Sequence, residues 1–360
     1  MTIPKNNVSH FLIRVDGSES IGTGHIMRCL ALAGELKKQG QVVSFLTALC
    51  PDALKKRLVA EGHVLNSLPS SVEAGSPVDA RFTAAAAAEK KAVWVIVDGY
   101  HFNGKYQHFI KDAGLKSLFI DDNAHCDYYC ADLVLNQNPS ATPDLYPDTD
   151  PRTRLLLGNQ YLLIRDQFLA YKKNNQAKNI ELVSKILVTM GGADKDNVSG
   201  RVMKALSNVA TPQNLEITAL IGAGNPHKQT LQNLTGELNA TAAPGHHFDT
   251  VVNASNMPQL MAEADLIITA GGTTVWEGAY LARPMAVIIT ADNQKAGMEV
   301  FSAQGAVKLL GEQQNLSDQN ISQYLLDLIN DESTRRALAG KASTLVDGQG
   351  ASRLVQALTA

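Results

Sequence analysis

Short apolar runs alternate with longer amphipathic stretches along the first half of the chain. The runs have the length of strands, whereas the stretches repeat apolar positions at the spacing of a helix. Glycine and proline mark the ends, since the stretch after Ile26 stops at Gly40 and the stretch over 51–62 opens with proline and closes with glycine. The predicted strands are 11–15, 42–48, 63–68, 93–98, 117–121 and 131–138, and the predicted helices are 26–39, 51–62, 82–91 and 105–113. This alternation predicts a mostly parallel sheet with helices on both faces.

The second half repeats this rhythm after a pause. Residues 170–184 are polar and have little periodicity, so we expect an interdomain linker over 171–184. We therefore expect two Rossmann-like α/β domains, 1–170 and 185–340, with a C-terminal helix over 341–360 packing on the pair. Ligands of such sheets bind at the carboxyl ends of the strands, so we expect the site in a cleft where two of these edges face each other. The predicted strands here are 185–190, 215–222, 250–252, 266–270, 285–290 and 306–310, and the predicted helices are 198–208, 228–238, 257–264, 273–282 and one from Asn293.

Length and composition agree with two globular domains. At 360 residues the chain exceeds what one hydrophobic core usually holds. With 45% hydrophobic residues, 19% charged residues and a formal net charge of -3, it has no basic stripe that would bind nucleic acid. The N-terminus lacks the features of a secretory signal, and no apolar run approaches the roughly 20 residues that cross a bilayer. We expect a cytoplasmic protein with no nucleic-acid partner and no integral membrane association.

The cysteines predict neither a disulfide framework nor a metal centre. Cys29, Cys50, Cys126 and Cys130 are few and scattered. His125 adjoins Cys126, but no second Cys/His pair stands at the spacing of a zinc site, so a surface turn is the simpler interpretation. We expect no metal and no other cofactor.

Three predicted strand-to-helix turns are rich in glycine: IGTGH at 21–25, MGGADKDN at 190–197 and AGGTTVWE at 270–277. None ends in the Gly-Lys-Ser/Thr of a P-loop, and none has the full Gly-x-Gly-x-x-Gly spacing. The glycine-rich turns therefore do not support ATP hydrolysis or nicotinamide binding as the function.

The turn at 270–277 has the features of a diphosphate and ribose site. Gly271 and Gly272 remove side chains where a helix begins, so backbone N–H groups and the positive end of the helix dipole are open to an anion. Thr273 and Thr274 add hydroxyl groups, and Glu277, one turn later, can accept hydrogen bonds from two vicinal ribose hydroxyls. The alternative is a capped helix in which an exposed Glu277 only stabilises the dipole.

The turn at 190–197 could form a second wall of that site. Gly191 and Gly192 permit close approach of a ligand, whereas Asp194 and Asn197 are better explained as caps of the following helix. The turn that begins at Ile221 is explained equally as a wall beside a nucleobase and as an ordinary connection.

The turn at 21–25 differs because it ends in a histidine at the start of a predicted helix. The positive end of the helix dipole disfavours the imidazolium form, which keeps His25 available as a base at neutral pH. Gly22 and Gly24 leave room for a substrate, and Asp16 is close enough in sequence to orient the other ring nitrogen or a sugar hydroxyl. The local pattern alone fits a helix-capping or packed histidine equally well.

Longer stretches resemble one known family, in order and over most of the chain. They are RVDGSESIGTGHIMRCLALA, VDGYHF, FIDDNAHCDYYCADLVLNQN, LLLGNQYLLIRDQF, LVTMGGAD, MPQLMAEADLIITAGGTTVWEGAYLARP and ADNQ. With them the chain resembles the UDP-2,4-diacetamido-2,4,6-trideoxy-β-L-altropyranose hydrolases of nonulosonic (pseudaminic) acid synthesis. The resemblance implies the GT-B fold, in which two Rossmann-like domains with parallel sheets face each other across a cleft. Relatives of this family also act on spore-coat polysaccharide precursors.

The resemblance also implies roles for individual residues. The general base falls on His25, and further active-site residues fall on Tyr100 of VDGYHF and Asn293 of ADNQ. One departure stands at Gly99, where relatives commonly carry a basic or histidine residue between the aspartate and the tyrosine. The implied UDP contacts are Gly191, Gly192, Asn256, Met257, Gly271, Gly272, Thr273, Thr274 and Glu277, and the predicted substrate-binding set is completed by Asp16, Gly22, Gly24, Arg28, Ile221 and Gln294.

The implied reaction is hydrolysis of a UDP-sugar. His25 would deprotonate a water that attacks the anomeric carbon from the face opposite the nucleotide, with inversion. UDP leaves as a stable anion, so the helix N-terminus at Thr273 would replace the acid of ordinary inverting glycosidases. We expect a UDP-sugar and water as substrates, and a monomer. A GT-B glycosyltransferase that uses an acceptor hydroxyl and a non-enzymatic nucleotide-sugar binding module remain as alternatives.

Overall fold

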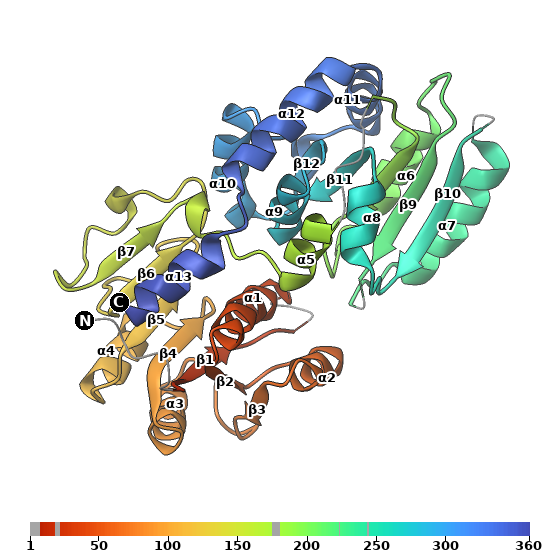
Figure 1. Cartoon of the computed structure of the whole chain (residues 1–360). Helices are drawn as coiled ribbons and strands as arrows, with labels where there is room; N and C mark the ends of the chain where they lie inside the picture. The colour runs from red at the N-terminus through yellow and green to blue at the C-terminus, as the bar shows by residue number, and fades with distance from the viewer. Residues whose placement is uncertain (1–7, 19–21, 175–180, 223, 243–244) are drawn as a thin grey trace. The chain divides into compact units, whose positions relative to one another are not determined.

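The apolar runs of the first half form one seven-stranded parallel sheet in the computed structural model (Figure 1). The structure describes residues 8–18, 22–174, 181–222, 224–242 and 245–360. Its contacts divide the chain into unit 1, which comprises 1–166 and 348–360, and unit 2, which comprises 167–347.

Unit 1 has the strand order β3-β2-β1-β4-β5-β6-β7. The order runs one way from β1 to β3 and the other way from β4 to β7, so it reverses between β1 and β4. The strands are β1 (His10–Val15), β2 (Val42–Thr47), β3 (Val64–Ser67), β4 (Ala92–Asp98), β5 (Ser117–Ile120), β6 (Leu133–Asn136) and β7 (Arg154–Leu157). The helices are α1 (Gly24–Lys38), α2 (Asp52–Ala60), α3 (Pro77–Glu89), α4 (Gly104–Asp112) and α13 (Gly350–Thr359), with short 3-10 turns η1 (Pro143–Leu145) and η2 (Asn159–Tyr161).

The two faces of this sheet carry separate apolar layers. Phe11 and Ile13 pack with α1 and α13 on one face, while Leu12 packs with α3 and α4 on the other. Successive residues of a strand point to opposite faces, so a strand that is covered on both sides is mainly apolar. This explains why β1 is apolar from Phe11 to Ile13 and at Val15, whereas Arg14 between them is buried as part of an ion pair.

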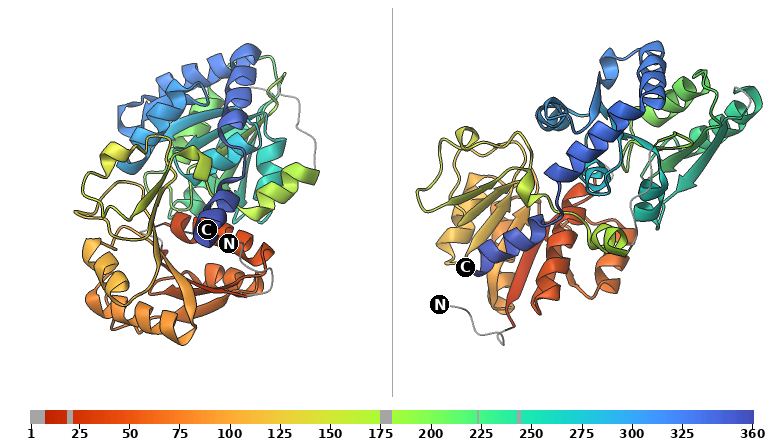
Figure 2. Two further views of the ribbon diagram at one scale, coloured as in Figure 1. Left: turned by 60° about the vertical axis from the view of Figure 1, so that its left-hand side comes forward. Right: turned by 45° about the horizontal axis from the view of Figure 1, so that its top comes forward.

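Unit 2 holds a six-stranded parallel sheet with the order β10-β9-β8-β11-β12-β13, and helices cover it on both faces (Figure 2). Here the order reverses between β8 and β11. The strands are β8 (Lys185–Thr189), β9 (Glu216–Ile221), β10 (His247–Val252), β11 (Leu266–Ala270), β12 (Met285–Ile289) and β13 (Lys308–Glu312). The helices are α5 (Asp166–Asn174), α6 (Val198–Ser207), α7 (Lys228–Thr241), α8 (Met257–Glu263), α9 (Thr273–Tyr280), α10 (Asp292–Ala303), α11 (Asp318–Asn330) and α12 (Glu332–Leu345), with the 3-10 turn η3 (Gln313–Asn315).

The structure differs from the predicted elements at several places, one of which is α3, since it begins at Pro77 and not at residue 82. The short edge strand β7 pairs only with β6 and was not predicted. Of the expected linker, residues 175–180 lie outside the described part, and 171–174 belong to α5. The units divide instead at Asp166/Gln167 and at Asp347/Gly348, so α12 belongs to unit 2, whereas α13 belongs to unit 1. α13 is fixed there by packing on α1 and by a hydrogen bond from Trp94 Nε1 to the carbonyl of Leu358 at 2.8 Å.

A buried ion pair joins the middle of unit 1. Arg14 on β1 has no exposed surface, and its Nε and Nη2 donate to the two carboxylate oxygens of Asp79 in the first turn of α3 at 2.9 and 2.8 Å. Nη2 also lies 2.8 Å from Asp16. Burial alone would lower the pKa of Arg14, but hydrogen bonds and charges from Asp79 and Asp16 raise it above its usual value. The pair therefore fixes α3 and the end of β1 against each other.

We expect Asp79→Ala to destabilise unit 1 by about 3–5 kcal/mol, because it leaves a buried guanidinium without its bidentate partner. Urea unfolding followed by Trp94 fluorescence, in a Trp276→Phe background, reports unit 1 alone. The control is Asp52→Ala, which removes the exposed partner of Lys55 and should leave the unfolding free energy nearly unchanged. Equal losses in the two variants would contradict the role given to Arg14.

Candidate functional site

The predicted base lies where the strand order of unit 1 reverses. The pairing of β1 with β4 sets Val15 beside Asp98 at the carboxyl ends of the two strands. α1 begins at Gly24, after the turn that follows β1, so His25 lies in the first turn of that helix. Open parallel sheets bind ligands outside the carboxyl ends of their strands at such a reversal. His25 therefore occupies the position at which this fold is expected to bind a ligand.

A buried carboxylate from the neighbouring strand holds the His25 ring. Nδ1 lies 2.7 Å from Oδ1 of Asp98, whose side chain is fully buried, and His25 is 7% exposed. An ionised carboxylate only accepts hydrogen bonds, so we assign the proton of the neutral ring to Nδ1, and Nε2 keeps its lone pair. Within the described parts of the chain, Nε2 has no hydrogen-bond partner. The arrangement can accept a proton at Nε2.

Arg28, one turn further along α1, binds the same carboxylate. Its Nε and Nη2 lie 2.7 and 2.6 Å from the two oxygens of Asp98, and Nη1 lies 2.7 and 2.9 Å from those of Asp122. Nη2 is also 3.1 Å from Nδ1 of His25. Burial on its own would raise the pKa of Asp98, but the charge of Arg28 and the hydrogen bonds from Arg28 and His25 hold it well below its usual range. Asp98 is therefore ionised at neutral pH.

The ring of Tyr100 lies against this cluster. It meets the imidazole of His25 edge-on at a centroid distance of 4.8 Å, and its hydroxyl donates to Asp122 at 3.0 Å. Tyr100 is 40% exposed, whereas His25 and Asp98 are buried. Of these side chains, Tyr100 is the one that solvent or a ligand reaches most easily.

A second histidine holds the loop that carries Tyr100. His125 Nε2 lies 2.9 Å from the carbonyl oxygen of Phe102, and Nδ1 lies 3.0 Å from Asp121. The hydrogen bond to Asp121 is the main reason why the pKa of His125 rises to about 11. With both nitrogens donating, His125 is a fixed cation at neutral pH and not a candidate base.

Asp16 does not orient His25, so that part of the sequence interpretation was wrong. The ring nitrogen is bound by Asp98, because the carboxylate nearest to the start of α1 comes from the end of β4 and not from Asp16, which follows β1. Asp16 instead accepts from two backbone N–H groups after β2, lies 2.8 Å from Arg14 and lies 3.0 Å from Nε2 of His101. It thus fixes the turn after β1 and the loop that bears Tyr100.

Backbone geometry explains the glycines near this cluster. Gly99 has a φ of 150°, and a Cβ there would lie 2.9 Å from Cε1 of His101 and 3.1 Å from the ring of Phe102. The ring of His101 thus fills the space that a side chain at position 99 would need, so this backbone favours glycine there. Gly22 has a φ of 84° and donates its N–H to the carbonyl of Ser18 at 2.9 Å, and Gly24 is the first residue of α1.

The predicted UDP-binding turns of unit 2 also flank a reversal of strand order. β11 pairs with β8, and the turns at 190–197 and 270–277 follow these two strands. Gly191 has a φ of 82°, and a Cβ at Gly191 or Gly192 would meet no described atom within 4 Å. Gly222, just after β9, lies against the backbone of Gly192, so its lack of a side chain lets the two turns pack together.

In the turn at 190–197, the side chains of Asp194 and Asn197 cap the following helix, as the sequence indicated. Asp194 accepts from the backbone N–H groups of Val198 and Ser199 at 2.8 and 3.1 Å, and Asn197 accepts from that of Gly200 at 3.3 Å. These contacts occupy the side chains at the start of α6. The open surface of this turn is therefore the backbone at its two glycines.

The two glycines of the turn at 270–277, Gly271 and Gly272, have different surroundings. A Cβ at Gly271 would lie 2.7 Å from Cγ of Met298 and 3.0 Å from Cβ of Gln294, whereas one at Gly272 would meet no described atom within 4 Å. The side-chain oxygen of Gln294 accepts from the N–H groups of Gly271 and Thr290 at 3.2 and 3.0 Å. Gln294, which was predicted to bind substrate, thus joins the ends of β11 and β12 in this structure. Gly272 starts α9 with no side-chain cap.

Glu277 is buried, with 5% of its surface exposed, so the alternative of an exposed glutamate that only stabilises the dipole of α9 does not hold. The other residues predicted in unit 2 sit at the starts of helices or the end of a strand. Thr273 and Thr274 open α9, Asn256 precedes α8 and Met257 opens it, Asn293 lies in the first turn of α10, and Ile221 is the buried last residue of β9.

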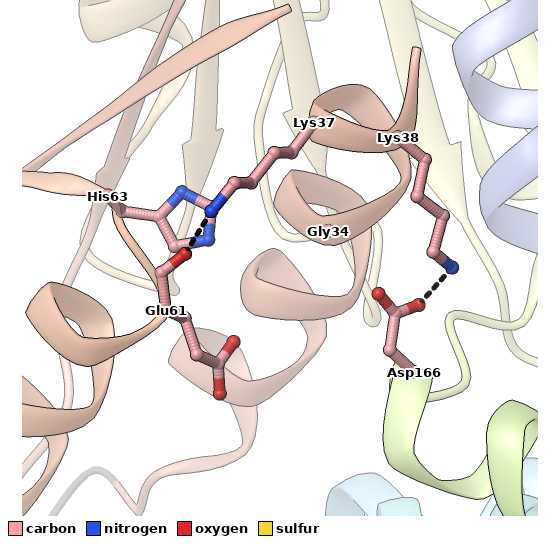
Figure 3. A pocket seen from close by; sticks show the side chains of 6 residues that line it. All are labelled: Gly34, Lys37, Lys38, Glu61, His63 and Asp166. Atoms are coloured by element: carbon pink, nitrogen blue, oxygen red, sulfur yellow. Dashed lines mark hydrogen bonds and ion pairs between the residues drawn. The ribbon is translucent and has the colours of Figure 1, made fainter. Parts of the chain in front are cut away.

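A cavity of about 370 Å³ in unit 1 lies away from this cluster (Figure 3). It is near the C-terminal end of α1, and from His25 to Lys37 the helix rises about 18 Å. Lys38 pairs with Asp166 at 2.7 Å, and Lys37 donates to the carbonyl of Glu61 at 2.6 Å, so both ammonium groups are engaged. The lining residues are Gly34, Lys37, Lys38, Glu61, His63 and Asp166. The cavity is therefore separate from the His25 cluster.

Two carboxylates of the cluster, Asp98 and Asp122, were not predicted as site residues. Both follow or end neighbouring strands, since β5 pairs with β4. An acidic residue at the carboxyl end of a parallel strand is a signal that could have found them.

In the described residues no group of three His, Cys, Asp or Glu side chains is placed to hold a metal ion. No helix among those residues is long and apolar enough to span a membrane.

Sequence comparison relates the chain to nucleotide-sugar proteins. Residues 185–354 match the glycosyltransferase family 28 C-terminal domain. The chain is 27% identical over 290 residues to the UDP-2,4-diacetamido-2,4,6-trideoxy-beta-L-altropyranose hydrolase of Campylobacter jejuni, which covers 79% of this chain and 93% of that protein. It is 24% identical over 247 residues to the spore coat polysaccharide biosynthesis protein SpsG of Bacillus subtilis, which covers 67% of this chain and 68% of SpsG.

A third relative is the uncharacterised protein MJ1062 of Methanocaldococcus jannaschii, which is 27% identical over 288 residues. That match covers 79% of this chain and spans only 56% of MJ1062. Together these relatives confirm the resemblance to the UDP-sugar hydrolases and the spore-coat proteins.

Solved structures confirm the GT-B fold. MurG of Acinetobacter baumannii matches with a TM-score of 0.66 and 19% identity over 97% of this chain and 99% of MurG. The UDP co-structure of S. aureus MnaA matches with a TM-score of 0.66 and 13% identity over 97% of this chain and 95% of MnaA. At these identities the likeness concerns the fold alone.

We expect Gly271→Ala to destabilise unit 2 by about 1–3 kcal/mol, because the added methyl group overpacks the contact with α10. The matched control is Gly272→Ala, which has a φ of -89° and open space at its Cβ. Urea unfolding followed by Trp276 fluorescence, in a Trp94→Phe background, reports unit 2. Comparable losses at the two glycines would contradict this account of the turn.

Proposed function

We propose that the protein is a hydrolase that removes UDP from a UDP-activated diacetamido-trideoxy sugar, with inversion, in nonulosonic (pseudaminic) acid synthesis. The observation that carries the proposal is the His25–Asp98 pair, in which Nδ1 is bound at 2.7 Å and Nε2 has no partner among the described residues. A hydrolase needs such a base because water is a weak nucleophile at neutral pH. The similarity to the Campylobacter jejuni hydrolase supports the choice of substrate class.

In this reaction Nε2 of His25 takes one proton from a water molecule while the water oxygen bonds to the anomeric carbon. The bond between that carbon and the oxygen of the β-phosphate breaks, and its electron pair leaves with UDP. Asp98 keeps Nδ1–H oriented and stabilises the imidazolium that forms, which later returns its proton to solvent. The products are the free sugar, with inverted configuration, and UDP.

Unit 2 is proposed to bind the nucleotide. The N-terminus of α9 has no side-chain cap, so its backbone N–H groups and the helix dipole can stabilise the diphosphate in the substrate and in the leaving group. Glu277 is proposed to accept hydrogen bonds from the ribose hydroxyls, and the backbone at Gly191 and Gly192 to lie against the ligand. No general acid is needed, because UDP is already a stable anion.

Tyr100 and Asn293 are proposed to contact the sugar. Tyr100 adjoins His25 and is exposed, which suits a residue that positions the substrate beside the base. Asn293 is exposed in the first turn of α10, next to Gln294. The identity of the sugar substituents rests on the relatives and not on a contact in this structure.

A glycosyltransferase is the second candidate, because residues 185–354 match a glycosyltransferase family domain. In that case the nucleophile is a hydroxyl group of an acceptor and not water. Incubating the protein with a UDP-diacetamido sugar alone separates the two, since a hydrolase releases equal amounts of UDP and free sugar. Proton NMR during the first minutes identifies the released anomer. Absence of free sugar, with turnover only after an acceptor is added, would favour the transferase.

We expect His25→Asn to lower kcat by roughly 10²- to 10⁴-fold, which is the usual contribution of a positioned general base. UDP affinity, measured by calorimetry, should stay close to that of the unsubstituted protein, because the nucleotide is proposed to bind unit 2. His108→Asn, which changes an exposed histidine on α4, serves as the matched control for the loss of an imidazole. Full turnover in His25→Asn with lost UDP binding would reverse the roles proposed for the two units.

We expect Glu277→Gln to weaken UDP binding by roughly 10- to 100-fold, the range for losing a hydrogen bond to a charged group. At saturating substrate, kcat should change little. Binding of 2′-deoxy-UDP tests the contact directly, because the deoxy ligand lacks one of the two hydroxyls and should lose less affinity in Glu277→Gln than UDP does. Glu299→Gln, on the exposed side of α10, is the matched control. An equal loss of affinity for UDP and 2′-deoxy-UDP in Glu277→Gln would rule out the ribose contact.

A further inference from the structure

Arg28 was predicted to bind substrate, yet its guanidinium is committed to the protein. Its Nε and Nη2 bind Asp98, Nη1 binds both oxygens of Asp122, and the side chain is 6% exposed. All three nitrogen atoms are therefore engaged. A phosphate group of a substrate would have to displace one of these carboxylates to reach Arg28.

The position of Arg28 matters because of its neighbour on the same helix face. Residues three apart on a helix lie side by side, and Nη2 of Arg28 is 3.1 Å from Nδ1 of His25. Without Arg28, two carboxylates would act on the imidazole with no cation between them. Both would favour the imidazolium form, which has no lone pair to accept a proton.

We propose that Arg28 is a positioning residue that keeps His25 in its neutral, proton-accepting form by compensating the charges of Asp98 and Asp122. This deepens the proposed function and rests on it, because a neutral His25 matters for turnover only if His25 is the base. The electrostatic coupling itself is a property of the free protein.

The other groups that face this cluster do not replace Arg28. Tyr100, from the loop after β4, contacts His25 through its ring edge and donates its hydroxyl proton to Asp122. Cys29 lies 3.4 Å from Asp98, and burial is the largest cause that raises the pKa of its thiol, which stays protonated. Arg28 is therefore the cation in contact with His25 among the described residues.

The test is the titration midpoint of the His25 imidazole, read by NMR on full-length protein labelled with ¹⁵N-histidine and free of substrate. The spectrum of His25→Asn identifies the signal. Arg28→Gln removes the cation, Asp122→Asn removes one carboxylate, and Arg28→Lys keeps the positive charge. Near-ultraviolet circular dichroism, and urea unfolding followed by Trp94 fluorescence in a Trp276→Phe background, establish that unit 1 of each variant is folded.

We expect the midpoint to rise by about 1 pH unit or more in Arg28→Gln, since a positive charge that disfavours the imidazolium, 3.1 Å from Nδ1, is removed. It should fall in Asp122→Asn and stay close to the unsubstituted value in Arg28→Lys. A rise in Arg28→Gln together with a fall in Asp122→Asn indicates charge compensation. Loosened packing would not shift the midpoint in opposite directions in the two variants. An unchanged midpoint in a folded Arg28→Gln overturns the proposal. If that variant does not fold, an unchanged or higher midpoint in Asp122→Asn overturns it.

The pH dependence of kcat supplies the functional readout. In Arg28→Gln the acid limb should move to higher pH, with activity recovering in alkaline buffer, whereas a merely structural loss would lower kcat at every pH. If His25→Asn keeps full turnover, the proposed hydrolase mechanism fails. The NMR midpoints would still decide whether Arg28 controls the charge of His25.

Discussion

The carboxylate of Asp98 is the contact on which the geometry of the unit 1 cluster depends. It is fully buried at the end of β4, and it binds His25 through one oxygen and Arg28 through both. A buried carboxylate is costly unless it is paired, so Arg28 makes the position of Asp98 possible. Asp98 in turn fixes which nitrogen of His25 carries the proton. Asp122 and Tyr100 extend the cluster toward solvent.

The sequence predicted the repeating α/β architecture well, because most buried strands are short, mainly apolar runs and most helices have clear ends. The place of His25 at the start of a helix was also predictable from the local pattern, whereas its role as a base is implied by the family resemblance and stays a prediction. Its partner was not predictable, because Asp98 is 73 residues away and meets His25 only through the pairing of β1 with β4. Proximity in sequence pointed to Asp16, which instead serves the turn after β1. The strand order of the sheet was the missing information.

The edge strand β7 and helix α5 escaped prediction for a different reason. β7 has four residues and pairs on one side only, and an apolar run as short as its three leucines does not by itself distinguish a strand from part of a helix. α5 ends in two lysines and an asparagine, and this polar end covers the start of the stretch that was predicted to be a linker. Gln294 illustrates the limit at the level of a side chain. Its place in a recognisable stretch indicated substrate binding, while its side-chain oxygen in fact accepts from the backbone of two turns.

The net charge of the His25 cluster suits the reaction proposed for it. With His25 neutral, the charges of Asp98, Asp122 and Arg28 sum to one negative charge in a largely buried setting. Glycosidic bond cleavage passes through a transition state in which positive charge develops at the anomeric carbon. A cluster with an excess negative charge stabilises that carbon and repels a diphosphate, whereas the uncapped N-terminus of α9 attracts one. Each unit taken by itself, these charges support the proposal that unit 1 contacts the sugar and that unit 2 contacts the nucleotide.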